Sequence, residues 1–411
     1  MSENTKLDLR VVQEAVSGSA AAFRCVTKLQ PTGGVGDKIF PPTYEKAKYA
    51  VEERVTPEGD VVKCVLLDSV QSQANRMEIA LLDAVRAGSI KLPLLVVNFD
   101  DRDLKKKIVV TSLEAPHRVA DAIFRDSMLD GVMFRESEKG KVLDWADLRN
   151  AAGLFGLCPT ALLFGIWDST GPRGGQGAKF QRAIVSEIVG YHAEPGVKTS
   201  SRIDPLQVTL GAGPLYQRNE KSPEKTNWTL KEEEAAKDNK NKAITIGKEG
   251  KPSEANHGNI TPTIVSGGFT IGWAKQTTVL SLAALRRLHF PINRGESFDS
   301  SVDNKARTVI ASLGIVAATL ARKDGLDLRS RCQLFPTEEI TWELLGTPGS
   351  EPKRFCVDET GAVELFKKAV EEAKECGLPW EGEIRLKPSD TLLSLLVKSQ
   401  ELAASLEAEE S

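Results

Sequence analysis

Apolar positions recur at helical spacing in the stretch LLDSVQSQANRMEIALLDAV, residues 66–85. They form one stripe, which predicts a helix with a single face packed on a core. The members of the stripe are Val70, Ala74, Met77, Leu81 and Val85. Asp68 or Ser69 suits the N-cap of this helix, and Gly88 suits its end. The β-rich run 61–67 before it predicts a strand.

Polar side chains crowd the start of the same helix: Gln71, Ser72, Gln73, Asn75 and Arg76. On a helical wheel Ser72, Asn75 and Arg76 lie opposite the apolar stripe. A solvated helix face is usually rich in Glu and Lys, whereas this face is rich in amides. Backbone N–H groups and the macrodipole at a helix start favour an anion, and these side chains add donors that suit phosphate. The pattern therefore predicts either a solvated face or an anion-binding one.

Other runs of apolar residues alternate loosely between strand and helix patterns. Strands are predicted at 9–12, 20–26, 92–99, 106–113, 261–274 and 326–334. Helices are predicted after Pro116 and at 278–288, 305–323, 361–378 and 390–409. The short apolar segment 159–167 fits a helix or a strand equally well. Without any internal repeat, this alternation favours an α+β fold with insertions.

Residues 217–258 carry very few apolar side chains. Such a composition cannot build a core, so the segment is predicted to be an exposed, flexible insertion.

Composition places the chain among globular proteins. Its 411 residues are 41% hydrophobic and 27% charged, which is enough for a sizeable core. The formal net charge is −3, so the chain as a whole is not a polycation. Contact with nucleic acid would therefore depend on local basic patches.

Cysteine and histidine spacing argues against a zinc site. Six cysteines and four histidines are scattered, and no C-x-x-C pair occurs. Widely separated cysteines in a chain of this size indicate reduced, buried thiols. The N-terminus is polar, and the longest apolar run, 308–321, is too short to span a bilayer. We therefore expect a soluble cytoplasmic protein with no membrane contact.

The stretch GPRGGQGAKFQR, residues 171–182, combines four glycines with three cations and no acid. Glycines let a backbone approach a phosphate closely and direct N–H groups at it. Neither G-x-x-x-x-G-K-[ST] nor G-x-G-x-x-G fits the stretch, so the nucleotide-binding signal is weak. A loop that follows a sugar-phosphate backbone through Arg173, Gln176, Lys179 and Arg182 and a plain surface loop are equally good interpretations.

A second basic feature is the absence of acids between Glu254 and Glu296, in a chain that is acidic overall. Buried strands exclude acids, but that does not explain the cations kept here. They are Lys275, Arg286, Arg287 and Arg294. We interpret the segment as a basic face.

Two shorter stretches add candidate contacts. LQPTGGVGDKIFPPTY, residues 29–44, combines a glycine turn with Lys38 and the aromatic residues Phe40 and Tyr44. Lysine pairs with phosphate and aromatic rings stack on bases, although a turn tucked under a core has the same composition. In LRSRC, Arg329 and Arg331 fall on one face of a predicted strand, which suits a row of phosphate contacts or an exposed edge strand.

Signals for catalysis are weak. None of the four histidines, at positions 117, 192, 257 and 289, has a neighbouring Ser, Cys or carboxylate in a known motif. The sequence DDRD at 100–103 could gather a metal ion but is also an ordinary turn. We therefore expect no enzyme activity, no metal and no cofactor.

Several of these stretches together resemble a known family. GGVGDKIFPPTYE, LLDSVQSQANRMEIAL, PHRVADAIFRDS, GPRGGQGAKFQRAIVSEIVGY, GGFTIGWA and LRSRC are similar to the backbone subunit of type I-G (formerly I-U) CRISPR surveillance complexes. That subunit belongs to the Cas-seven group of the RAMP superfamily. The similarity covers residues 20–335. Relatives that bind RNA through an RRM display aromatic residues on a strand, and no such RNP motif is legible here.

The resemblance implies an RRM-like (ferredoxin-like) palm with large insertions. Its first part would be residues 1–216 and its second part 259–340. The polar insertion 217–258 would be the thumb or a flexible loop, and 341–411 would be a helical C-terminal region.

The resemblance also implies a function. The chain would be a non-catalytic subunit that binds CRISPR guide RNA (crRNA), oligomerises along it and assembles with other CRISPR subunits. Target DNA would be read through the guide by base pairing. The RNA contacts would be Lys38, Gln71, Ser72, Asn75, Arg76, Arg173, Gln176, Lys179, Arg182, Lys275, Arg286, Arg287, Arg329 and Arg331. The alternative is a metal-independent RNA endonuclease of the same superfamily that processes CRISPR RNA, with His117 or His192 as general acid–base.

Overall fold

The computed structural model describes residues 5–100, 104–171, 176–219, 226–292, 298–323 and 325–410. It confirms the α+β class. The chain divides into two compact units. The first comprises Met1–Asp101, Lys107–Glu194 and Phe269–Leu393, and the second comprises Arg102–Lys106, Pro195–Gly268 and Ser394–Ser411.

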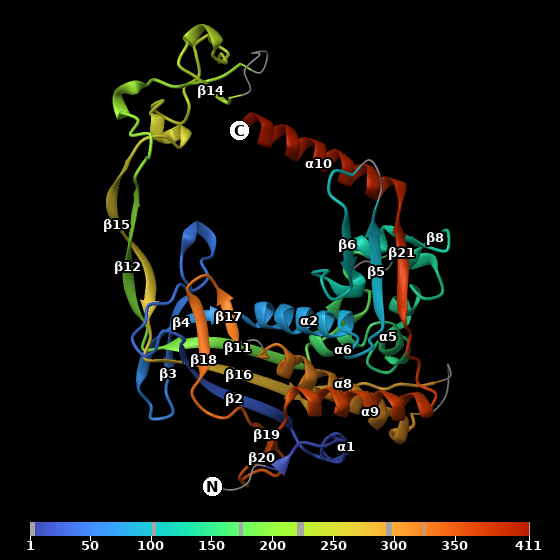
Figure 1. The fold of residues 1–411 in the computed structure, drawn as a ribbon. Helices are drawn as coiled ribbons and strands as arrows, with labels where there is room; N and C mark the ends of the chain where they lie inside the picture. Colours follow the sequence, from blue (N-terminus) through green and yellow to red (C-terminus); the bar gives the residue numbers. More distant parts are fainter. Residues whose placement is uncertain are drawn as a thin grey trace. The chain divides into compact units, whose positions relative to one another are not determined.

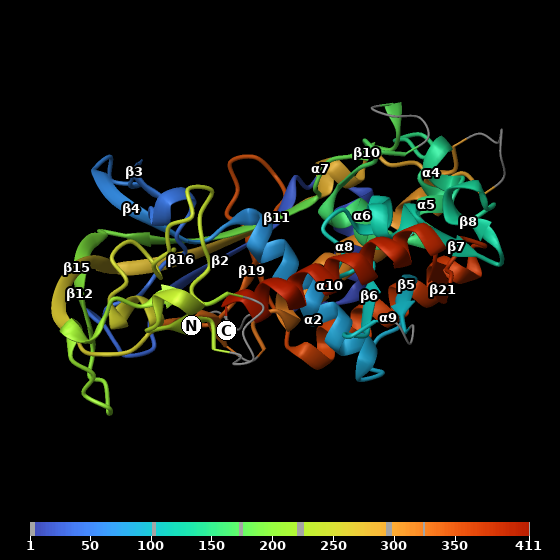
Figure 2. The ribbon, with the colours of Figure 1, turned by 90° about the horizontal axis from the view of Figure 1, so that it is seen from above.

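A ten-stranded sheet forms the centre of the first unit (Figures 1 and 2). In spatial order its strands are β1 (Thr5–Lys6), β20 (Lys353–Cys356), β19 (Trp342–Leu345), β2 (Ala22–Pro31), β16 (Trp273–Ser281), β11 (Ile184–Tyr191), β4 (Val61–Asp68) and β3 (Val51–Val55). The hairpin of β17 (Leu326–Arg329) and β18 (Cys332–Pro336) joins the sheet through β18, which pairs with β2. All pairs in it except β1–β20 are antiparallel.

Helices α2 (Val70–Arg86) and α8 (Ser300–Leu320) pack on one face of this sheet, α2 against β11 and α8 against β16. The alternation of buried and half-buried residues along β16 matches this arrangement, because successive strand residues point to opposite faces. Gly314 allows the close approach of α8, since a Cβ there would lie 3.1 Å from Leu280 of β16 and 3.2 Å from Leu163.

Shorter elements complete the first unit. They are α1 (Leu9–Ser17), α3 (Ala122–Arg125), α4 (Val142–Trp145), α5 (Ala152–Leu157), α6 (Pro159–Phe164), α7 (Leu282–Leu285), α9 (Glu359–Glu375) and the pair β9 (Ile166–Trp167) and β10 (Lys179–Phe180). The undecided segment 159–167 is thus a helix followed by a short strand. Helix α10 (Asp390–Glu410) begins in this unit and continues into the second.

A second, five-stranded sheet also lies in the first unit, in the order β6 (Ile108–Thr111), β5 (Leu94–Phe99), β21 (Glu383–Pro388), β7 (Ser127–Leu129) and β8 (Val132–Met133). Its strands β5 and β6 confirm the prediction for 92–113. The region 341–411 is not purely helical, because β19 and β20 extend the large sheet and β21 lies inside the smaller one.

The second unit is built around a two-stranded ribbon of β12 (Glu194–Arg202) and β15 (Ile260–Thr270). The ribbon carries a tip segment, residues 203–259, that includes β13 (Tyr216–Gln217) and β14 (Trp228–Thr229). The Asp204 carboxylate accepts N–H bonds from Leu206, Val208 and Gly258, and Glu254 likewise accepts from several backbone N–H groups. Hydrogen bonds to the backbone therefore organise a segment whose composition lacks a core.

Three element predictions are wrong. Residues 9–12 lie in helix α1 rather than a strand, because Asp8 caps the helix by accepting from the Val11 N–H. The predicted helix 278–288 begins as strand, since β16 continues to Ser281, and only the single turn of α7, Leu282–Leu285, is helical. The predicted strand 326–334 is the β17–β18 hairpin, which turns at Ser330–Arg331. Among the described helices, none has the length and apolar character needed to cross a membrane.

Candidate nucleic-acid interface

The start of α2 is a capped helix, as the sequence predicts, but its polar side chains differ in their surroundings. Ser69 is the N-cap and accepts the N–H of Ser72. Gln71 and Asn75 are exposed and Ser72 is half-buried, and within the described chain their side chains make no hydrogen bond. Gln73, by contrast, is buried beneath the helix. The three other polar side chains remain available as neutral donors and acceptors.

Gln73 belongs to a hydrogen-bonded network between α2 and the sheet. Its amide donates to Asp68 Oδ2 at 2.6 Å and accepts from Ser186 Oγ at 2.9 Å and Gln276 Nε2 at 2.7 Å. Ser186 Oγ and Thr278 Oγ1 lie 2.8 Å apart. A buried amide that satisfies neighbouring polar groups fixes the orientation of α2 on β11 and β16.

Arg76 is held by the protein rather than projecting freely. Its Nε donates to Asp68 Oδ2 at 2.9 Å, and its Nη2 donates to the Leu328 carbonyl at 2.6 Å. Asp68 is only 1% exposed. Arg76 therefore ties α2 to β17 and neutralises a buried carboxylate, so its side chain has a structural role besides any contact with an anion.

The β17–β18 hairpin presents Arg329 and Arg331 next to the start of α2. The two arginines do not share one strand face as predicted, because Arg331 lies in the turn with a φ of 60°. Both side chains are exposed, and neither has an ion-pair partner among the described residues. Because Arg76 joins α2 to this hairpin, two unpaired cations lie beside the neutral donors of the helix.

The loop with Lys38 contacts the same hairpin. The Phe40 N–H donates to the Arg331 carbonyl at 2.9 Å, and the Arg331 guanidinium lies 4.3 Å from the Phe40 ring centroid. Burial raises the pKa of Cys332 to about 11, and the positive charges of Arg329 and Arg76 oppose part of that rise. We call this group the hairpin–helix cluster: Lys38, Phe40, Gln71, Ser72, Asn75, Arg76, Arg329 and Arg331.

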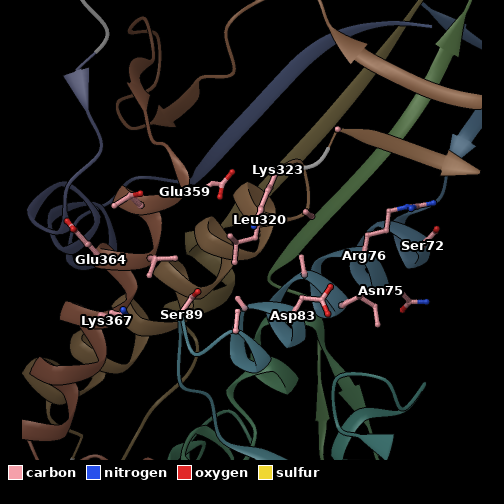
Figure 3. Close-up of a pocket in the computed structure, with 18 residues that line it drawn as sticks. Ser72, Asn75, Arg76, Asp83, Ser89, Leu320, Lys323, Glu359, Glu364 and Lys367 are labelled. Atoms are coloured by element: carbon pink, nitrogen blue, oxygen red, sulfur yellow. The ribbon is translucent and has the colours of Figure 1, made fainter. Parts of the chain in front are cut away.

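A groove of about 870 Å³ continues from this cluster between α2, the end of α8 and the start of α9. Figure 3 shows Ser72, Asn75 and Arg76 at one end of it and Glu364 and Lys367 at the other. Its other charged residues are Asp83, Lys323 and Glu359. The mixed charges show that the positive character belongs to the hairpin–helix cluster and not to the groove as a whole.

The described residues of the glycine-rich stretch 171–182 have no described contact with the hairpin–helix cluster and form a second candidate site. Lys179 pairs with Trp167 across β9–β10, and its Nζ lies 5.0 Å from the Trp167 ring centroid. Gln176 is exposed, and Arg182 is half-buried beside the Glu78–Arg118 ion pair. Burial, followed by the charge of Arg118, lowers the pKa of Arg182. Arg173 lies outside the described residues.

Lys275 lies on the opposite face of the sheet from α2, because its neighbour Gln276 points toward Gln73. Its Nζ lies 4.9 Å from the ring centroid of Tyr191, which stacks on Trp273 with centroids 4.2 Å apart. Tyr191 and Trp273 are far apart along the chain, so no local pattern in the sequence predicts this aromatic pair. The sequence offers little signal for the pair: each residue follows a glycine, as Gly190–Tyr191 or Gly272–Trp273, and only Trp273 falls in a predicted strand, 261–274.

The two arginines after β16 have different surroundings. Arg286 donates to the carbonyls of Ala15 at 3.4 Å and Ala20 at 2.5 Å, which ties α7 to the end of α1. Arg287 is exposed. Neither has a described contact with the hairpin–helix cluster, so the predicted basic segment does not form one continuous face with it.

No catalytic group is evident in the described chain. The rings of His117 and His192 are exposed and make no hydrogen bond to another described side chain. His289 bonds Asp303 at 2.6 Å, but Asp303 also accepts from Arg307 and from the Phe290 N–H, as in a structural cluster. Among the described residues, no group of three or more His, Cys, Asp or Glu side chains is placed to hold a metal ion.

Comparison with known families adds one finding. The family model described as CRISPR-associated protein GSU0053 (Cas_GSU0053) matches residues 23–195. The match supports a CRISPR-associated protein. It therefore supports a role in CRISPR defence beside other CRISPR components. The matched part includes Lys38, the polar start of α2 and the glycine-rich stretch, whereas the β17–β18 hairpin lies beyond it. No curated protein matches the chain.

Proposed function

We propose that this protein is a non-catalytic backbone subunit that binds CRISPR guide RNA and oligomerises along it in a type I-G interference complex. The hairpin–helix cluster would hold the phosphates of the guide. Other copies of the chain and other CRISPR subunits are its protein partners, and target DNA is reached through the guide.

One observation carries the proposal. The exposed cations Arg329 and Arg331 lie on the hairpin that is bonded to the start of α2. That part of α2 carries three polar side chains without a hydrogen bond in the described structure, Gln71, Ser72 and Asn75. Cations and neutral donors together bind a sugar-phosphate backbone without selecting bases. Such a surface suits a subunit that must accept any guide sequence. The family match gives the CRISPR context for it.

The β12–β15 ribbon with its tip is our candidate for the thumb of this subunit. Along the chain it lies between β11 and β16, which pair directly with each other in the large sheet, and it makes up most of the second unit. The polar segment 217–258 is then part of the tip rather than the whole thumb.

The test is RNA binding by the double variant Arg329→Ala/Arg331→Ala. A charge-assisted hydrogen bond contributes about 1.5–3 kcal/mol, so we expect affinity for single-stranded RNA to fall about tenfold or more. The slope of log affinity against log salt should decrease in magnitude by about 0.7 for each phosphate contact removed. Fluorescence anisotropy over a salt series measures both quantities.

The matched control is Arg10→Ala/Arg385→Ala, which removes two exposed arginines outside the cluster. The control should keep wild-type affinity. Equal losses in both double variants would show that only total charge matters, and wild-type binding by the cluster variant would remove the hairpin from the interface.

The endonuclease alternative predicts that the protein cleaves CRISPR repeat RNA, whereas our proposal predicts that it does not. Under our proposal, purified protein leaves CRISPR repeat RNA intact, and His117→Ala or His192→Ala changes neither RNA binding nor assembly. Denaturing gels of labelled repeat RNA measure cleavage. Cleavage by the wild type that either substitution abolishes would replace our proposal with the endonuclease.

A further inference from the structure

Trp167 is an exposed aromatic residue that the hairpin–helix cluster does not include. It is 56% exposed, although a tryptophan side chain ordinarily gains free energy by burial. Lys179 lies over its ring, and no described carboxylate forms an ion pair with that amine. The pair therefore combines an accessible aromatic surface with an unneutralised positive charge.

The backbone under Trp167 is held in place by buried groups. The next residue, Asp168, is 1% exposed and accepts from Arg135 Nη1 at 2.7 Å, and Arg135 also donates to Asp144 at 2.8 Å. The Asp168 N–H donates to the Ala178 carbonyl at 2.9 Å, which closes β9 against β10. A buried ion pair thus fixes the strand that displays the exposed ring.

Glycines at both ends of the neighbouring loop make room for this arrangement. A Cβ at Gly171 would overlap the Asp168 carboxylate, and a Cβ at Gly177 would collide with the Asp168 backbone. The loop therefore starts and ends against Asp168, directly beside Trp167. Glycine is required at these two places by close approach rather than by flexibility.

We propose that Trp167 is a stacking platform for one base of a bound single-stranded nucleic acid, with Lys179 on an adjacent phosphate. Every base has a π face, so a stacked tryptophan tolerates any sequence, and the neighbouring lysine gives the charge complementarity that a phosphate needs. This inference rests on the proposed function and adds a contact to bases, separate from the phosphate contacts of the hairpin–helix cluster.

The experiment measures binding of a mixed-sequence single-stranded RNA to the full chain carrying Trp167→Ala, Trp167→Phe or Lys179→Ala. Loss of one stacked base should weaken binding about 5- to 100-fold. The slope of log affinity against log salt should keep its wild-type value in Trp167→Ala, because no charge is lost. In Lys179→Ala its magnitude should decrease by about 0.7. Trp167→Phe should recover part of the affinity, since phenylalanine keeps a ring.

The matched control is Trp145→Ala, which removes a tryptophan that is exposed to a similar extent, 58%. It should bind RNA like the wild type, and thermal melting should show that all variants fold. An RNA that carries abasic sites should bind wild type and Trp167→Ala equally, because there is no base to stack.

The outcomes separate this inference from the proposed function. If wild-type protein binds no RNA, the proposed function fails and the platform fails with it. If wild type binds RNA and Trp167→Ala binds equally well, only the platform is overturned. If Trp167→Ala keeps its RNA affinity but loses association with other CRISPR subunits, Trp167 is a protein contact and the inference is overturned in favour of that role.

Discussion

At the scale of single residues, polar side chains at the start of α2 divide into two groups with different energetics. Gln73 and Arg76 bond to buried partners, above all the carboxylate of Asp68, whereas the side chain of Asn75 makes no hydrogen bond in the described structure. Removing the cation that pairs with a buried carboxylate lowers the free energy of unfolding far more than removing a solvated amide side chain does. Binding and stability should therefore respond differently at positions 75 and 76.

We expect Arg76→Ala to lower the free energy of unfolding by about 1–3 kcal/mol, because Asp68 is left without its cation. Asn75→Ala should change it by less than about 0.5 kcal/mol. Urea denaturation followed by circular dichroism measures both values. The double variant Asp68→Asn/Arg76→Ala is the control and should recover part of the loss, since the uncompensated charge is gone. An Arg76→Ala protein as stable as the wild type would contradict the structural role of this ion pair.

At the scale of elements, carboxylates organise the ribbon tip in place of a hydrophobic core. Backbone N–H groups, those of Gly258 and of Lys248 first, lower the pKa of Asp204 and of Glu254. A carboxyl whose pKa is lower in the folded state stabilises that state above its unfolded pKa, near about 4, and stops doing so as the pH falls through the folded pKa. The tip should therefore loosen in acid.

We expect hydrogen exchange of residues 203–259 to become faster in the wild type, after correction for intrinsic rates, as the pH falls below about 4. Glu254→Gln should exchange faster already at neutral pH and should show a weaker dependence on acid, because its amide cannot ionise. Glu233→Gln, a change of an exposed carboxylate in the same tip, is the control and should match the wild type. Identical pH profiles for Glu254→Gln and the control would show that Glu254 does not organise the tip.

At the scale of the whole molecule, charge is unevenly distributed. The formal net charge is −3, yet Arg329 and Arg331, which have no ion-pair partner among the described residues, both lie in the hairpin–helix cluster. Separately, Lys275 lies on the face of the sheet opposite α2. Under the proposed function, attraction to RNA would come from these patches and would compete with repulsion by the rest of the surface. Phosphate contacts of this kind release counterions, so binding should be strongly dependent on salt and nearly independent of sequence.

If copies of the chain add along the guide, as we propose, the mass of the protein–RNA complex should increase in steps as the RNA is lengthened. Protein without RNA should not form the same series. Mass photometry at one salt concentration measures the steps, and two RNAs of equal length and unrelated sequence provide the control. A single mass at every RNA length, or a strong preference for one sequence, would contradict a backbone subunit.

The sequence by itself determined the elements that depend on neighbours along the chain. The apolar stripe of α2, its Ser69 cap and the strands β4 and β5 follow from local periodicity and capping, and the structure confirms them. The same local signals fail where partners are distant. Strands β19, β20 and β21 are short and owe their pairing to strands far away in the chain, so their residues alone did not predict them.

Only the tertiary structure decided which polar residues are free and which are bonded. It buried Gln73 between Ser186 and Gln276, joined Arg76 to the carbonyls of β17, and stacked Tyr191 on Trp273. Each of these contacts joins residues far apart in the sequence, and no periodic pattern records such a distance. The physical reason is that a helix or strand determines the direction of a side chain, whereas the rest of the fold determines what lies there.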